Sequence, residues 1–130
     1  MRNAQAGTVL IADDDPTLCD LLIELLQDEG YGAERALDAP SLLARLRSGG
    51  VCLMLIDVLM PGQDGLSIIR RVVAEGPAVP IVAVSASTLH LAEAAAAGAT
   101  STLAKPFELD EALAVVARHC GAPDTQQLAS

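Results

Sequence analysis

The sequence predicts an α/β fold in which a parallel sheet is covered by helices on both faces. Short uninterrupted apolar runs alternate with longer segments whose apolar residues recur at helical spacing. The run 51–57 is the clearest strand, because its six consecutive apolar residues fit a strand buried on both faces. Five strand–helix pairs follow one another in this way, which implies right-handed crossovers and one doubly wound (βα)5 domain.

Each strand is bounded by residues that open or end a helix. The strands are expected at 8–12, 31–36, 51–57, 79–84 and 101–104. The helices are expected to begin at Pro16, Pro40, Asp64, about Leu89 and about Leu109. A carboxylate followed by Pro is a favourable helix start, and Gly30, Gly76 and Gly98 are plausible ends. The pattern leaves a core of about 8–120, a polar tail at 121–130, and no repeat or second domain within 1–130.

Composition excludes several classes of function. The chain has 8 Lys and Arg against 17 Asp and Glu, and its net charge of −9 would repel a nucleic-acid backbone. One Tyr and one Phe leave few platforms for base stacking. The apolar stretches are too short to cross a bilayer, and no signal peptide opens the chain. We therefore expect no direct binding of nucleic acid, no membrane insertion and a cytoplasmic location.

The three cysteines lie far apart in the sequence. Cys19, Cys52 and Cys120 show no CxxC spacing, and they fall within or at the end of apolar patterns. The expectation is three buried free thiols in a reducing compartment.

Polar residues gather where the predicted strands end. Asp13 and Asp14 follow the first strand, Asp57 ends the third, Ser85 follows the fourth and Lys105 follows the fifth. In a parallel sheet these ends share one edge, where open α/β sheets bind ligands. At least one of the crowded carboxylates must take up a proton unless a cation compensates their charge, and ligands that are all oxygen favour Mg²⁺ as that cation. A hydroxyl and an ammonium opposite them would suit a phosphoryl group.

This constellation resembles the receiver domain of two-component response regulators. The matching stretches are Val9-Leu-Ile-Ala-Asp13-Asp14-Asp15-Pro16, Leu55-Ile-Asp57-Val-Leu-Met60-Pro61-Gly62 with Asp64-Gly65, Val82-Ala-Val-Ser85-Ala86 and Lys105-Pro106-Phe107. The resemblance implies a flavodoxin-like strand order 2-1-3-4-5 and a cis peptide bond before Pro106. It also implies a phosphoacceptor that catalyses at most its own phosphorylation and slow dephosphorylation, so it is not a conventional enzyme.

The resemblance implies a role for each site residue. Asp57 would accept the phosphoryl group from a phosphohistidine on a histidine kinase or phosphotransfer protein. Mg²⁺ would be held by Asp13, Asp14, Asp57 and the backbone carbonyl of Leu59. Ser85 and Lys105 would bind the phosphoryl oxygens. A downstream protein would then bind the face made by the fourth helix, fifth strand and fifth helix.

One position departs from the family pattern. An aromatic commonly serves as the switch two residues before Ala104, but this chain has Thr102 there. Ser85 and Thr102 are therefore the candidate switch residues, and the missing ring favours an alternative function, a receiver-fold interaction module that works without phosphorylation. An aspartyl-phosphate phosphatase is disfavoured because Leu59 replaces the acid that such enzymes carry. A Rossmann domain is disfavoured because no GxGxxG or GxxxxGK[ST] motif occurs.

Overall fold

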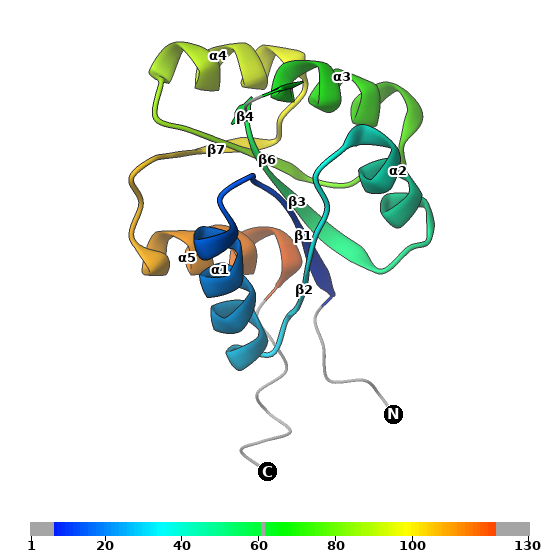
Figure 1. The fold of residues 1–130 in the computed structure, drawn as a ribbon. Helices are drawn as coiled ribbons and strands as arrows, with labels where there is room; N and C mark the ends of the chain where they lie inside the picture. The colour runs from blue at the N-terminus through cyan, green and yellow to red at the C-terminus, as the bar shows by residue number, and fades with distance from the viewer. Residues whose placement is uncertain (1–6, 61, 122–130) are drawn as a thin grey trace.

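The computed structural model describes residues 7–60 and 62–121. Five parallel strands form its main sheet in the spatial order β2-β1-β3-β6-β7 (Figure 1). Their bounds are Thr8–Ala12 for β1, Gly32–Arg35 for β2, Val51–Asp57 for β3, Ile81–Ser85 for β6 and Ser101–Ala104 for β7. Counting only these five strands, the order is 2-1-3-4-5. The predicted fold class and strand order are confirmed.

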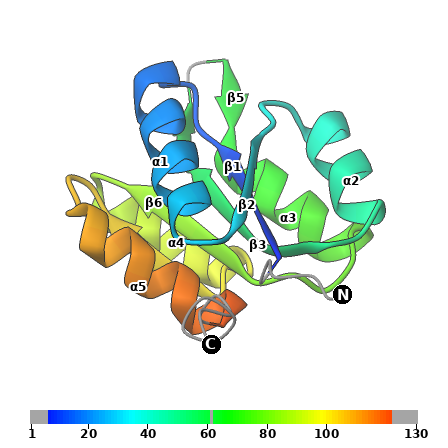
Figure 2. The same ribbon diagram turned by 90° about the horizontal axis from the view of Figure 1, so that it is seen from below.

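Helices cover both faces of the sheet. They are α1 (Pro16–Asp28), α2 (Ala39–Arg47), α3 (Gly65–Glu75), α4 (Thr88–Ala97) and α5 (Leu109–Cys120). Figure 2 shows α1 and α5 together on one side, with α2 and α3 on the other. The buried side chains divide accordingly into a core under α1 and α5 and a core under α2, α3 and α4. None of the described helices is long and apolar enough to span a membrane.

The apolar run of β3 is explained by these two cores. Leu53 and Leu55 pack toward α1 and α5, whereas Met54 and Ile56 pack toward the other three helices. Successive side chains of a strand point to opposite faces, so a central strand between two helical layers needs apolar residues at every position. β3 lies between β1 and β6, and it therefore holds Asp57 near the middle of the sheet edge.

Helix starts are fixed by polar side chains, as the sequence predicts. Asp15 caps α1 by accepting hydrogen bonds from the backbone N–H groups of Thr17 and Leu18. Asp64 caps α3 through the N–H of Leu66, at 3.0 Å. Each cap satisfies N–H groups that the first turn of a helix leaves without a partner. The two caps therefore determine the residues at which α1 and α3 begin.

The cysteine prediction is wrong for two of the three residues. Cys52 near the start of β3 and Cys120 at the end of α5 form a disulfide, with Cα atoms 5.3 Å apart. The two cysteines are 68 positions apart in the sequence, and that spacing says nothing about distance once α5 packs back across β3. Cys19 is free and buried, as predicted.

A small hairpin between β3 and α3 is absent from the sequence prediction. β4 (Leu59–Met60) pairs antiparallel with β5 (Gln63–Asp64). Two-residue strands are too short to give an alternating pattern. The predicted turn at Pro61-Gly62 falls here, although Pro61 lies outside the described residues.

Candidate functional site

Four strands deliver the predicted site residues to one edge of the sheet. Asp13 follows β1, Asp57 ends β3, Ser85 ends β6 and Lys105 follows β7. The registers Ala12–Ile56 and Asp57–Val84 keep the neighbouring strand ends level. Asp13 is 5% exposed, Asp57 is 8% exposed and Ser85 is 1% exposed. Polar groups buried to this degree need partners, and the structure supplies them.

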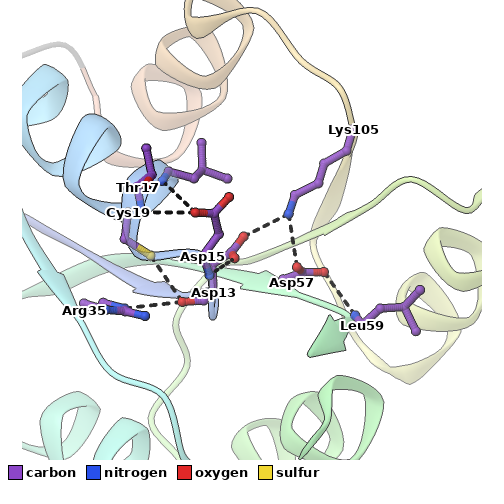
Figure 3. Close-up of polar contacts among 9 residues, drawn as sticks. Asp13, Asp15, Thr17, Cys19, Arg35, Asp57, Leu59 and Lys105 are labelled. Atoms are coloured by element: carbon purple, nitrogen blue, oxygen red, sulfur yellow. Dashed lines mark hydrogen bonds and ion pairs between the residues drawn. The ribbon is translucent and has the colours of Figure 1, made fainter. Parts of the chain in front are cut away.

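Lys105 joins the two buried carboxylates. Its Nζ donates to Asp13 Oδ2 at 3.0 Å and to Asp57 Oδ2 at 3.1 Å (Figure 3). Burial acts to lower the pKa of Lys105, but the hydrogen bonds and negative charges of Asp13 and Asp57 together outweigh it, so this pKa is raised. The side chain of Lys105 is 26% exposed and stays charged, which provides the cation that the crowded carboxylates require.

Three carboxylates lie close enough to share a metal ion. One oxygen each from Asp13, Asp14 and Asp57 can be chosen so that all three lie within 4.8 Å of one another. Asp13 Oδ1 accepts from the N–H of Asp15 at 2.9 Å, and Asp57 Oδ1 accepts from the N–H of Leu59 at 3.0 Å, which fixes both carboxylates. Asp14 is exposed. A cluster of hard oxygen ligands, partly open to water, fits Mg²⁺.

Two residues that the sequence prediction missed hold the backbone beneath this cluster. The carbonyl oxygen of Asp13 accepts a hydrogen bond from Cys19 Sγ at 3.2 Å and another from Arg35 Nε at 3.3 Å (Figure 3). Arg35 is the last residue of β2, so the strand-end argument that selected Asp57 and Ser85 also applies to it. Burial raises the pKa of the Cys19 thiol, so this group acts as a neutral donor.

A glycine allows α3 to approach the phosphoacceptor candidate closely. A Cβ at Gly65 would lie 2.6 Å from the carbonyl oxygen of Val58 and 2.9 Å from that of Asp57. The N–H of Gly65 also donates to the Val58 carbonyl at 3.2 Å. The first residue of α3 therefore packs directly against the backbone next to Asp57.

Comparison with known proteins identifies the family. The model of the response regulator receiver domain matches residues 9–117. The chain belongs to this family. Receiver domains are the phosphoacceptor modules of two-component systems, and the cluster of Asp13, Asp14 and Asp57 fits their phosphoacceptor site.

Individual relatives agree with this assignment. The receiver domain is 32% identical to the transcriptional regulatory protein DltR of Streptococcus agalactiae over 82% of the chain and 48% of DltR. It is 34% identical to the nitrogen assimilation regulatory protein NtrX of Azorhizobium caulinodans over 87% of the chain and 26% of NtrX. The chain thus spans half or less of the length of these relatives.

Solved structures give the same result for the fold. The receiver domain of NtrX from Brucella abortus superposes with a TM-score of 0.78 at 29% identity, covering 86% of this chain and 97% of that one. The chemotaxis protein CheY4 of Vibrio cholerae gives 0.75 at 29% identity, covering 87% of this chain and 98% of that one.

The remaining predicted residues of the receiver domain lie near the acidic cluster or on β7. Ser85 Oγ accepts from the N–H of Ser87 at 3.1 Å, at the entry to α4. The Lys105–Pro106 peptide bond is cis, as the resemblance implied. Thr102 lies within β7, paired with Ala83, and is exposed. The structure therefore brings Asp13, Asp14, Asp57 and Lys105 together and leaves Thr102 outside this group.

Proposed function

We propose that this receiver domain takes a phosphoryl group from a phosphohistidine onto Asp57 and thereby changes a protein-binding surface. The observation that carries the proposal is the Lys105 ammonium, which joins Asp57 to Asp13 at 3.1 and 3.0 Å. A carboxylate nucleophile, two further acidic groups and a fixed cation at one sheet edge match the requirements of phosphoryl transfer, which depends mainly on positioning and charge neutralisation.

The chemistry can be assigned to the residues of this site. A carboxylate oxygen of Asp57 attacks phosphorus in line, the P–N bond of the phosphohistidine breaks, and the leaving imidazole nitrogen takes up a proton. Lys105 neutralises charge on the transferred group, and the buried Ser85 hydroxyl donates to one of its oxygens. Asp13, Asp14, Asp57 and the Leu59 carbonyl would hold Mg²⁺, which supplies further charge neutralisation when bound.

A groove beside the site suggests where the donor binds. Asp15, Leu18 and Leu21 of the α1 region line it on one side, and Pro106, Phe107 and Leu109 line it on the other, next to Lys105. Leu21 is 44% exposed, which leaves an apolar contact for a partner. We propose that a histidine kinase or phosphotransfer protein docks here. A cytoplasmic location for the receiver domain is part of this proposal.

The output side is proposed to be the face made by α4, β7 and α5. Leu89 at the start of α4 is 66% exposed and offers an apolar contact for a target protein. The Ser85 hydroxyl would report the phosphoryl group to α4, because Ser85 is followed directly by the α4 entry. Thr102 on β7 would be a switch residue of this face, although it lacks the usual aromatic ring.

A single receiver domain with a core of about 8–120 stays a prediction, and residues 122–130 of its predicted polar tail lie outside the described part.

Incubation with acetyl phosphate and Mg²⁺ tests the proposal. Electrophoresis in a gel that retards phosphoproteins should show a shifted band for the wild type and for Asp20→Asn, an exposed carboxylate on α1 that serves as a control. Asp57→Asn should give no shifted band. An unshifted wild type, or an equal shift in Asp57→Asn, would contradict the proposal.

The second candidate is an interaction module that acts without phosphorylation. It is favoured by one observation, the exposed Thr102 at the usual aromatic position. Under this alternative Asp57→Ala would bind the target as tightly as the phosphorylated wild type does. Under our proposal the variant binds like the unphosphorylated protein.

A further inference from the structure

The disulfide lies at the opposite end of β3 from the phosphoacceptor candidate. Cys52 is the second residue of the strand and Asp57 is the last. Cys120 is the last residue of α5. The disulfide therefore links the C-terminal end of α5 to β3, the strand whose other end carries Asp57 of the acidic cluster. It has no role in the phosphoryl transfer proposed above.

The two cysteines are held side by side by contacts that do not depend on their bond. β3 is paired on both sides, with β1 and with β6. Val115 and Val116 of α5 are buried against the sheet. Beyond Cys120, the hydroxyl of Tyr31, a residue only 2% exposed, donates to the Gly121 carbonyl at 2.8 Å.

These contacts have a consequence for the thiols. The Cα–Cα distance of 5.3 Å is within the ordinary reach of a disulfide. Reduced thiols would stay close to each other, and the bond could form again without refolding.

Access distinguishes this pair from the third cysteine. Cys52 and Cys120 are half-buried, whereas Cys19 is fully buried and donates to the Asp13 carbonyl. Thiol–disulfide exchange needs a thiolate that can reach the attacked sulfur in line. Cys52 and Cys120 are therefore more open to a small reagent than Cys19, which is 0% exposed.

We propose that Cys52 and Cys120 form a reversible thiol–disulfide site through which the redox state of the compartment controls the end of α5. Persistent disulfides are uncommon in a reducing compartment, where those that form are mostly transient and redox-sensing. The thiol–disulfide site does not depend on the proposed phosphorylation, whereas the reducing compartment and the effect on the output face rest on the proposed function.

The oxidant is a low-molecular-weight disulfide such as glutathione disulfide. One protein thiolate attacks it, forms a mixed disulfide and releases one thiol. The second protein thiolate then forms the Cys52–Cys120 bond and releases another. The two protein thiols lose two electrons and two protons in total, and the reagent takes up both as it becomes two thiols.

The expected structural effect is confined to one part of the molecule. The bond closes a sequence separation of 68 residues and holds the last turn of α5 on β3. After reduction that turn keeps its apolar contacts and the Tyr31 hydrogen bond, but it loses its covalent anchor. α5 contributes to the proposed output face, so the redox state would change the rigidity of that face.

Equilibration in glutathione buffers of graded composition, without phosphodonor, tests the inference. Samples are quenched in acid, alkylated with iodoacetamide after unfolding, and weighed by mass spectrometry. The Cys19→Ser variant removes the background thiol, and Cys52→Ser is the matched variant that cannot form the bond. In Cys19→Ser we expect two alkylated thiols in reduced glutathione and none as the disulfide form increases, with full reversal by excess dithiothreitol under native conditions.

Hydrogen exchange and thermal melting supply independent readouts. Reduction should speed amide exchange at residues 117–121 and leave α1 unchanged, and the melting temperature should fall by about 5–10 °C. Cys52→Ser should behave like the reduced wild type. Thiols that stay alkylatable in excess glutathione disulfide would overturn the proposal. The proposal would also be overturned if dithiothreitol did not reduce the disulfide in the folded protein. Equal amide exchange rates at residues 117–121 in the oxidised and reduced protein would overturn it as well.

Discussion

Lys105 Nζ donates to Asp57 Oδ2 at 3.1 Å, although the two residues are 48 positions apart in the chain. The same ammonium reaches Asp13, so one cation offsets two carboxylates that are each less than a tenth exposed. Lys105 is also the only lysine of the sequence. These facts make Lys105 the residue whose replacement should disturb the site most.

Replacing Lys105 with Met should lower stability in a pH-dependent way. Removing one partner leaves buried carboxylates unpaired, and because Lys105 is partly exposed we expect a loss of about 1–3 kcal/mol at pH 8. The pKa of Lys105 is raised in the folded chain, so its contribution is fully present below the usual value of 10.5 and is lost as the pH rises through the raised value.

Thermal melting of both proteins between pH 8 and pH 12 checks this prediction. The difference in melting temperature between wild type and Lys105→Met should shrink toward the upper end of that range. Arg71→Met, which removes an exposed pair with Glu75, should cost little at any pH. A Lys105→Met difference that stays constant across the range would show that the ion pairs contribute nothing.

Mg²⁺ should stabilise the domain through the three carboxylates. At ten times the dissociation constant, binding to the folded state alone contributes about 1.4 kcal/mol, or about 5 °C in melting temperature for a chain of this length. Asp14→Asn should melt at an equal or higher temperature without Mg²⁺, since it removes like-charge repulsion, yet gain less from Mg²⁺. Asp20→Asn should gain as much as the wild type. An equal gain in Asp14→Asn would remove Asp14 from the metal site.

Replacing Gly65 with Ala should impair both stability and phosphorylation. The new Cβ would lie 2.7 Å from Val58 Cα and 2.6 Å from its carbonyl oxygen, so the backbone next to Asp57 must shift. We expect a loss of about 1–3 kcal/mol and slower labelling by acetyl phosphate. Among residues 7–60 and 62–121, no atom lies within 4 Å of a Cβ built at Gly50, so Gly50→Ala meets the strain of a φ of +81° without a clash against that part of the chain. It should lose stability but label at the normal rate, and equal labelling of the two variants would contradict this account of Gly65.

An arginine at Leu21 should separate docking from chemistry. Leu21 lines the groove beside Lys105 and is 44% exposed. Leu21→Arg should slow phosphoryl transfer from a cognate phosphohistidine protein by tenfold or more, because losing about 1.4 kcal/mol of binding free energy corresponds to a factor of ten. Labelling by acetyl phosphate should stay normal. Leu89→Arg on α4 should leave both rates unchanged. Equal slowing of both variants would place the donor elsewhere.

Much of this site follows from the sequence because strand ends are easy to read. An apolar run that stops at a polar residue marks a strand end, and parallel strands bring such ends together, as they do for Asp13, Asp57 and Lys105. Arg35 also ends a strand, but it can be recognised in this way only when the end of β2 is known. β2 has just four residues, so its end is hard to predict from the sequence. Cys19 was missed because its thiol acts through the Asp13 carbonyl, a backbone contact that residue patterns do not encode.

The disulfide could not be predicted for a different reason. Whether Cys52 and Cys120 meet depends on where α5 ends relative to the start of β3, and helix ends are the part of an element that periodicity defines least well. The β4–β5 hairpin is similarly local, since its pairing depends on turn geometry between strands of two residues each.

Direct location of the phosphoryl group tests the central claim most sharply. After labelling with acetyl phosphate and Mg²⁺, borohydride reduces an aspartyl phosphate to homoserine, and tandem mass spectrometry of the peptides finds the converted residue. We expect homoserine at position 57 alone. Conversion at position 13 or 14, or no conversion in protein that has taken up phosphate, would contradict it.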